Sequence, residues 1–181
     1  KDIESRLAEA ERVSYERLAT LIDVAFPITF GAYGEDGCLQ GLLALLKIPF
    51  VGSDVLAAAL GQDKGMQRVL LQQNPKINIP PFSTVNRSEP LERFLFAFPV
   101  VAKPARGGSS LGVEVILTQQ DLSTALERIL PYDGRAIIEP LLHGLEFSCI
   151  VIEDEPLHTS PLIKGRIPRA LTPTETVHTQ E

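Results

Sequence analysis

The feature that most limits the fold is the placement of glycine and proline, which divide the apolar segments of this chain into short pieces. Residues 24–30 form an apolar run that ends at Gly31, and residues 49–51 form a second run that ends at Gly52. Between them, leucines recur at helical spacing over residues 39–46. A short buried strand, a helix and another short strand in this order predict a parallel α/β layer.

The rest of the chain predicts short strands with few helices, an α+β lobe that follows the α/β lobe. Asp63 is a suitable N-cap for a helix that ends at Gln73, and Thr118 is a suitable N-cap for helix 119–130. Gly61 is expected to end the helix at 54–60. The expected helices are 1–17, 39–46, 54–60, 63–73 and 119–130, the last with one apolar face made by Leu122, Ala125, Leu126 and Ile129. The expected strands are 81–85, 98–103, 113–117, 135–139 and 146–152. Prolines favour strand and loop over helix in the last quarter, at Pro156, Pro161, Pro168 and Pro173.

Composition excludes several classes of function. The chain has 181 residues, is 44% hydrophobic and carries a formal net charge of −6, which argues against a nucleic-acid groove because such a groove needs a positive stripe. No apolar run is long enough for a bilayer and no signal peptide opens the chain, so we expect a cytoplasmic protein with no membrane partner. Cys38 and Cys149 lie in apolar stretches and are expected to be buried thiols. The three histidines are expected at the surface or in turns: His143, His158 and His178.

The segment 98–112 combines features that suit an anion. An apolar strand ends at Lys103, and a loop with two hydroxyl side chains, Ser109 and Ser110, follows. The loop contains three glycines, Gly107, Gly108 and Gly112. Glycines let backbone amides bend around phosphate oxygens, and the lysine adds a point charge. Taken alone, the same pattern also fits a flexible hairpin with a solvated lysine, and its spacing matches neither a P-loop nor the dinucleotide fingerprint.

Two other segments are candidates for binding. Glu139 and Glu146 lie at the ends of two strands joined by a short connection, which suits a purine edge and ribose hydroxyls but also fits ordinary surface glutamates. Lys64 borders an apolar helix face and either reaches a cleft or lies along the surface. Arg106, beside the glycine-rich loop, fits a phosphate ligand as well as a solvated side chain.

Together these segments resemble the D-alanine–D-alanine ligase family of the ATP-grasp superfamily. Residues 31–41 are similar to that family's G-x-x-GEDG-x-x-QG signature, and residues 51–53 and 63–64 to its VGS and DK elements. Residues 103–112 resemble its KP-x-x-x-GSS-x-G phosphate loop, and residues 139–146 its E-x-x-x-x-G-x-E hinge. The resemblance covers roughly residues 22–152, and the occurrence of these motifs in this order is more specific than any one of them.

The resemblance implies an ATP-grasp fold, α/β and α+β. Residues 1–57 would be the remainder of a Rossmann-like N-terminal substrate domain, 58–139 the small ATP-grasp lobe with the phosphate loop, and 140–181 the start of the large lobe. It also implies an ATP-dependent ligase that forms D-alanyl-D-alanine for peptidoglycan synthesis through an acyl phosphate, with Mg²⁺ assisting.

The resemblance also assigns site residues. Lys64 and Lys103 would bind ATP phosphates, and Ser110 would lie in a mobile loop that closes over them. Ser109, in the same loop, would be catalytic because it orients a substrate alanine. The nucleoside would be held by Glu139, Leu141 and Leu142 at adenine and by Glu146 at ribose.

The chain departs from the family pattern in several places. Phe30 stands where the family has histidine, which leaves open a related ligase that makes D-alanyl-D-lactate or another dipeptide. The glutamate expected to hold the first substrate's amine, the substrate-carboxylate arginine and the acidic and asparagine Mg²⁺ ligands do not occur; the metal ligands are expected beyond residue 181. We therefore expect the 181 residues alone to bind nucleotide weakly without completing catalysis. A non-catalytic ATP-binding module is the other alternative, and helix 39–46 fits a homodimer face as well as a core.

Overall fold

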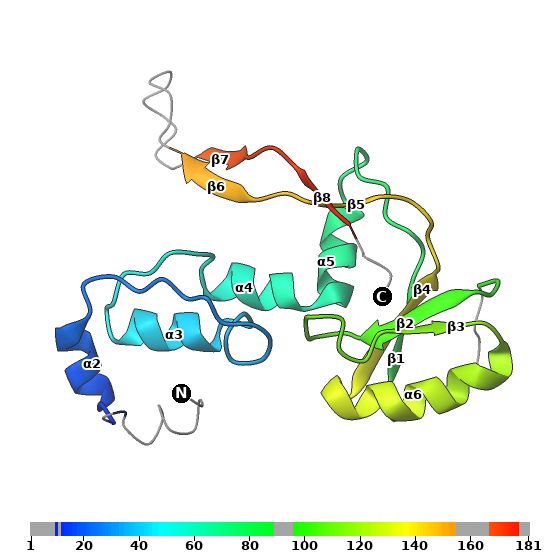
Figure 1. Ribbon diagram of the computed structural model, residues 1–181, viewed down its shortest axis with the longest axis horizontal. Coiled ribbons are helices and arrows are strands. Elements are labelled where there is room, and N and C mark those ends of the chain that lie inside the picture. The colour runs from blue at the N-terminus through cyan, green and yellow to red at the C-terminus, as the bar shows by residue number, and fades with distance from the viewer. Residues whose placement is uncertain (1–9, 11, 89–95, 155–166, 178–181) are drawn as a thin grey trace. The chain divides into compact units, whose positions relative to one another are not determined.

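The computed structural model describes residues 10, 12–88, 96–154 and 167–177. It divides into two compact units, Lys1–Leu141 and Leu142–Glu181. The helices of the first unit are α2 (Tyr15–Leu21), α3 (Cys38–Leu45), α4 (Val55–Gln62), α5 (Lys64–Leu71) and α6 (Gln119–Asp133). Its strands are β1 (Ser83–Asn86), β2 (Val100–Pro104), β3 (Glu114–Ile116) and β4 (Arg135–Pro140) (Figure 1).

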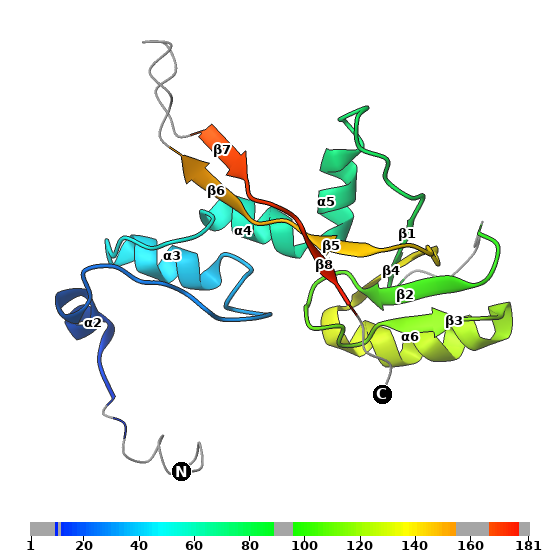
Figure 2. The same ribbon diagram turned by 45° about the horizontal axis from the view of Figure 1, so that its top comes forward.

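The four strands form one antiparallel sheet in the order β1-β4-β2-β3. Helix α6 covers one face of this sheet, as Figure 2 shows. The buried core between them consists of Val100, Ala102, Ile116, Leu122, Ala125, Leu126, Ile129, Ala136 and Ile138. The expected apolar face of helix 119–130 is therefore confirmed, and the strands expected at 98–103, 113–117 and 135–139 are confirmed with small shifts at their ends.

The other face of the sheet carries two charged side chains, Lys103 and Glu139, next to apolar ones. In the ladder between β2 and β4, Lys103 lies opposite Ile137, and Val101 lies opposite Glu139. Because side chains alternate along a strand, Lys103 and Glu139 are diagonal neighbours on the face away from α6. The first turn of α5 lies on this same face, since a Cβ on Gly65 would stand 3.8 Å from Cδ1 of Ile137.

Several expected helix boundaries were wrong. The helix expected over residues 1–17 falls partly outside the described residues; in the described part, α2 begins only at Tyr15, capped by Ser14. Gly61 does not end its helix: α4 continues to Gln62, and Gly61 lacks the positive φ that a helix-ending glycine adopts. Helix α6 continues past residue 130 through Pro131 and ends at Gly134, with φ 74°.

The strand expected at 24–30 was also wrong. Among the described residues, this segment forms only an isolated parallel bridge between Ala25 and Phe50. Its apolar side chains are largely exposed, for example Phe26 at 71% and Ile28 at 76%. A strand needs partners along its length, and here a single partner residue is in place.

The second unit consists of two strand pairs. β5 (Glu146–Ser148) pairs with β8 (Thr174–Thr176), and β6 (Val151–Asp154) pairs with β7 (Ile167–Ala170). The strand expected at 146–152 is therefore split, because its two halves pair with different strands. The strand-and-loop character expected for the last quarter is confirmed in its described part; Pro156, Pro161, His158 and His178 lie outside the described residues.

Cys38 and Cys149 are both exposed, not buried as expected: Cys38 is the first residue of α3, and Cys149 lies at the break between β5 and β6. His143 is exposed in a connecting segment, as expected. None of the helices in the described residues has the length and apolar character needed to span a bilayer.

Candidate functional site

The loop at residues 31–37 is folded by its own carboxylates. The backbone N–H of Gly31 donates to Oε2 of Glu35 at 2.6 Å. The N–H groups of Tyr33 and Cys38 donate to Asp36 at 2.8 and 3.0 Å. The Tyr33 bond is the largest reason why the pKa of Asp36 lies below its ordinary value. These acidic groups therefore shape the loop.

The start of α3 requires the glycine and glutamine of the same motif. Gly37 has φ 93°, and a Cβ there would lie 2.8 Å from the carbonyl oxygen of Val55. The buried Gln40 side chain donates from Nε2 to the carbonyl of Gly34 at 3.1 Å. The motif thus holds the 31–37 loop against α3 and α4 by close backbone packing.

The segment at residues 105–113, which we call the phosphate loop, has an unusual backbone. Left-handed φ values occur at Gly107 (121°), Ser109 (52°), Ser110 (57°) and Gly112 (70°). Two adjacent serines with positive φ are uncommon, and such conformations cluster at ligand sites. Gly108 faces the 31–37 loop, since a Cβ there would lie 3.8 Å from Oε2 of Glu35. Ser109 and Ser110 are exposed.

Three cationic side chains gather beside the phosphate loop. Lys64 donates from Nζ to the carbonyl of Gly107 at 2.9 Å. Lys103 and Arg68 both form ion pairs with the carboxylate of Glu139. Burial lowers the pKa of Lys64, and the positive charges of Lys103 and Arg68 lower it further. The carboxylates of Asp133 and Asp63 act in the opposite direction, so burial and the two cations together outweigh two acidic neighbours at Lys64.

Asp63 anchors the first turn of α5 beneath this loop. Its Oδ1 accepts from the N–H groups of Gly65 and Met66, both at 3.1 Å, as expected of an N-cap. Its Oδ2 is ion-paired with Arg135 and lies 3.6 Å from Nε of Arg106. Burial raises the pKa of Asp63, but the Arg135 hydrogen bond, the Met66 N–H and the two arginine charges outweigh it and leave the pKa lowered.

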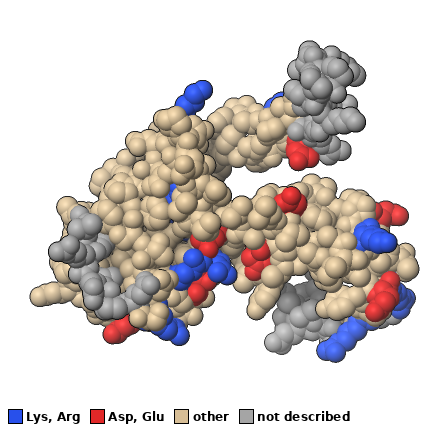
Figure 3. All heavy atoms as spheres, turned by 180° about the vertical axis from the view of Figure 1, so that it is seen from behind, with Lys and Arg blue, Asp and Glu red and all other residues tan. Residues whose placement is uncertain are grey.

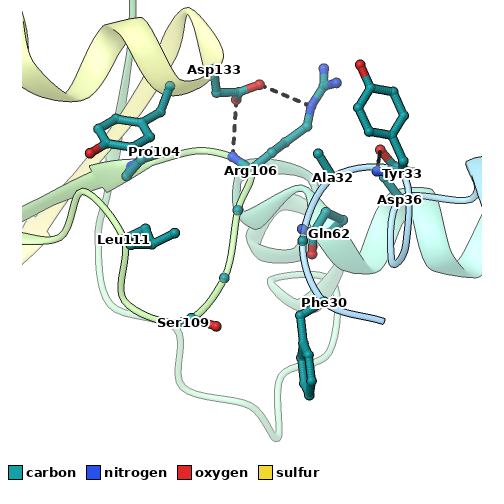
Figure 4. Close-up of a pocket in the computed structure, with 14 residues that line it drawn as sticks. Phe30, Ala32, Tyr33, Asp36, Gln62, Pro104, Arg106, Ser109, Leu111 and Asp133 are labelled. Carbon is teal, nitrogen blue, oxygen red and sulfur yellow. Dashed lines mark hydrogen bonds and ion pairs between the residues drawn. The ribbon is translucent and has the colours of Figure 1, made fainter. Parts of the chain in front are cut away.

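Arg106, which the sequence left undecided, is held by carboxylates on both sides. Its backbone N–H donates to Oδ2 of Asp133 at 3.1 Å, and its side-chain Nε lies 3.7 Å from Oδ1 of the same residue. The other carboxylate is that of Asp63. Figure 4 shows both contacts and the guanidinium tip extending past them toward Tyr33. Since Asp133 lies at the end of α6, the phosphate loop is fixed at its first residues to both α5 and α6.

A pocket of about 560 Å³ separates the phosphate loop from the 31–37 loop. Ser109, Leu111 and Arg106 line one side, and Phe30 and Tyr33 line the other (Figure 4). Its walls combine apolar rings with hydroxyl and guanidinium groups, a composition typical of small-molecule sites.

The structure brings some of the predicted site residues together within the first unit. One network of contacts contains Lys64, Lys103 and Glu139. Two residues after Glu139, the N–H of Leu141 donates to the carbonyl of Pro99 at 3.2 Å. Leu142 and Glu146 belong to the second unit, where both are exposed.

Sequence reasoning missed two members of the network. Arg68 follows Lys64 by four residues on α5, so helical spacing placed both on one face and was a usable signal. Asp133 was missed because the helix was expected to end at residue 130.

Charge over the described surface is mixed. On the face drawn in Figure 3, most of the described Lys and Arg side chains lie near Asp or Glu side chains, and one at the upper edge stands alone. No continuous basic stripe runs across the described part of that face, as a nucleic-acid groove would require.

Comparison with known proteins agrees with these motifs. Residues 71–172 match the family described as D-ala D-ala ligase C-terminus, and residues 1–53 match D-ala D-ala ligase N-terminus. A D-alanine–D-alanine ligase from Mycobacterium bovis is 41% identical over 154 residues, covering 81% of this chain and 40% of that protein. A putative D-alanine–D-lactate ligase from Streptomyces coelicolor is 39% identical over 148 residues, covering 82% of this chain and 41% of that protein.

Solved structures are similar as well. The D-alanine–D-alanine ligase from Bacillus anthracis complexed with ATP aligns with a TM-score of 0.70 and 28% identity, over 91% of this chain and 51% of that one. The chain thus spans about two fifths of the length of its curated relatives and has part of the ATP-grasp fold. With a family match over more than half of its residues, the chain belongs to the D-alanine–D-alanine ligase family.

Proposed function

We propose that the protein is an ATP-dependent ligase that joins two D-alanines, and that its phosphate loop binds the triphosphate. The observation that carries this proposal is the convergence of Lys64, Lys103 and Arg68 beside a loop whose backbone adopts left-handed φ at four positions. Several cationic side chains next to a loop with exposed serine hydroxyls suit a polyphosphate.

The proposal gives each predicted residue a role. Lys64 and Lys103 neutralise the phosphates, and Ser109 and Ser110 donate to them or orient a substrate alanine. The adenine contacts would come from Glu139, Leu141 and Leu142, and the ribose contact from Glu146. Ser109 also lines the pocket beside Phe30, which makes this pocket a candidate for the amino-acid substrates.

The proposed reaction follows from the family. The carboxylate of one D-alanine attacks the γ-phosphorus of ATP, the bond to ADP breaks, and an acyl phosphate forms. The amine of the second D-alanine then attacks the acyl carbon, loses a proton and releases phosphate, which leaves the dipeptide. The residues described here supply positioning and charge neutralisation for this transfer.

Magnesium, cellular role and compartment are parts of the same proposal. We expect Mg²⁺ to accompany ATP; among the described residues no group of three acidic, histidine or cysteine side chains could hold a metal, so we assign it no ligand. D-alanyl-D-alanine serves peptidoglycan synthesis and hence cell shape, and we place the reaction in the cytoplasm, where ATP is available.

Phe30 leaves open a second candidate, a ligase that takes D-lactate as the second substrate. This side chain lines the pocket and is 81% exposed. A phenyl ring neither accepts nor donates a proton, so a substrate amine or hydroxyl receives no acid–base help from this position. Phosphate release from ATP by the full-length protein, measured with D-alanine alone and with added D-lactate across pH, separates the two ligases. No stimulation by either substrate would instead indicate a non-catalytic ATP-binding module.

Nucleotide titration tests the binding proposal. The purified protein is titrated with ATP and Mg²⁺ by calorimetry, together with Lys103→Ala and a control, Lys76→Ala, which changes an exposed lysine away from the phosphate loop. We expect Lys103→Ala to weaken binding by about tenfold or more, because a hydrogen-bonded ion pair with phosphate is lost. The control should bind like the wild type. Equal affinity of the wild type and Lys103→Ala would rule out the phosphate-loop assignment.

A further inference from the structure

The carboxylate of Glu139 has two cationic partners, which come from different elements. Arg68 of α5 hydrogen-bonds Oε2, and Lys103 of β2 hydrogen-bonds Oε1. All three side chains are largely buried, with exposed fractions of 15% for Arg68, 19% for Lys103 and 12% for Glu139. Removing every cation from beside a carboxylate this far from water would leave an uncompensated buried charge, which is costly.

The two cations differ in how firmly they are held. The Arg68 guanidinium also donates from Nη1 to the carbonyl of Lys64 at 3.1 Å, and it lies 5.8 Å from the ring centroid of Phe82. The Nε of Arg68 is buried and has no hydrogen-bond partner among the described residues. One donor of the guanidinium is therefore left unsatisfied at this position. Lys103 carries a single ammonium on a flexible stem, which has three donors and can turn from one acceptor to another.

This arrangement creates a conflict for nucleotide binding. If Lys103 turns toward a phosphate, as the proposed function requires, its bond to Glu139 weakens. Without another cation, the buried carboxylate would then be left uncompensated, and that cost would be subtracted from the phosphate affinity. Arg68 removes the conflict because its contacts to α5 and Phe82 keep it beside Glu139.

We propose that Arg68 is a positioning residue of the nucleotide site: it keeps Glu139 paired, so that Lys103 is released to the phosphates. This inference rests on the proposed function. It assigns no direct phosphate contact to Arg68, and it makes the effect of Arg68 depend entirely on the presence of the Glu139 carboxylate.

A double-mutant cycle tests this dependence, with inorganic tripolyphosphate as the probe. Tripolyphosphate has no base, so the proposed contact of Glu139 with adenine does not enter. Affinity is measured by calorimetry for the wild type, Arg68→Met, Glu139→Gln and the double variant, with Arg68→Lys as the conservative replacement. Arg128→Met is the matched control, because Arg128 of α6 forms an ion pair at the surface with Glu114 of β3.

We expect Arg68→Met to weaken tripolyphosphate binding by about tenfold or more, and Arg68→Lys to restore most of the affinity. In the Glu139→Gln background, replacing Arg68 should change the affinity by no more than about threefold, because no buried charge remains to be compensated. Glu139→Gln alone should bind at least as tightly as the wild type, a result that stands even if Arg68→Met fails to fold. Arg128→Met should bind like the wild type.

Three results would overturn the inference. An equal loss from Arg68→Met with and without the Glu139 carboxylate would make Arg68 a direct phosphate ligand. Weaker binding by Glu139→Gln would show that the carboxylate does not restrain Lys103. Unchanged binding by Arg68→Met would remove its role. The proposed function fails separately, if the wild type binds neither tripolyphosphate nor ATP with Mg²⁺.

Discussion

Asp63 joins α5 to β4 and to the phosphate loop. Two replacements distinguish the contribution of its helix-cap hydrogen bonds from that of its negative charge. Asparagine caps helices as well as aspartate does, so Asp63→Asn keeps the bonds to the N–H groups of Gly65 and Met66 and removes the ion pair with Arg135. Hydrogen bonds between charged groups contribute about 1.5–3 kcal/mol, and Asp63 is only 7% exposed. We therefore expect Asp63→Asn to lower the free energy of unfolding by about 2 kcal/mol. Asp63→Ala should lower it by about 1 kcal/mol more, because the cap is lost as well.

The loss should also depend on pH. The folded-state pKa of Asp63 lies below its ordinary value, despite the opposing effect of burial, because of Arg135, the Met66 N–H and Arg106. A carboxyl whose pKa falls on folding stabilises the protein above its unfolded pKa, about 3.9, and loses this contribution as pH falls through the folded value. The difference in stability between the wild type and Asp63→Asn should therefore be full at pH 7 and shrink below about pH 4.

Urea denaturation at neutral and acid pH measures both effects. Asp54→Asn is the matched control, since Asp54 caps α4 by accepting from Ala57 N–H at 2.8 Å and is exposed. We expect this control to change stability by less than about 0.5 kcal/mol. The reasoning fails if Asp63→Asn is no more destabilising than Asp54→Asn at pH 7, or if its cost persists unchanged in acid.

Three further predictions concern the core and the loop. Ile129→Ala should cost about 2–5 kcal/mol in urea denaturation, since this side chain is fully buried under the sheet; a cost below about 1 kcal/mol would contradict the packing described. Gly112→Ala should lower stability by about 1–2 kcal/mol in thermal unfolding, because φ is 70° and the new Cβ would lie 3.0 Å from Pro104 and 3.2 Å from Tyr132; an unchanged Tm would argue against this backbone. Lys64→Met should speed limited proteolysis within the phosphate loop, because its hydrogen bond to the loop carbonyl at 2.9 Å is lost, and equal cleavage rates would refute that tie.

The start of helix 119–130 and its buried face were predictable because the N-cap Thr118 and the apolar spacing are local properties of the sequence. The strand at 24–30 was not, because an apolar run becomes a strand only where partners supply its backbone hydrogen bonds. Within the described residues only Ala25 of this run has such partners: its N–H donates to the carbonyl of Pro49, and its carbonyl accepts from the N–H of Val51. The prediction that both cysteines are buried was also wrong. Their exposure depends on what packs against them and not on their apolar sequence neighbours.

For the candidate site, the sequence by itself determined which groups are available: a lysine at a strand end, a glycine- and serine-rich loop, an acidic N-cap and a glutamate leaving a strand. Only the tertiary structure decided their pairing. Lys103 and Glu139 are 36 residues apart and meet because the antiparallel register of β2 and β4 sets them diagonally on one face. Arg68 reaches the same carboxylate across 71 residues because α5 lies on that face. Spacing along a chain specifies neighbours within one helix or strand, whereas the partner of a buried charge depends on how separate elements pack.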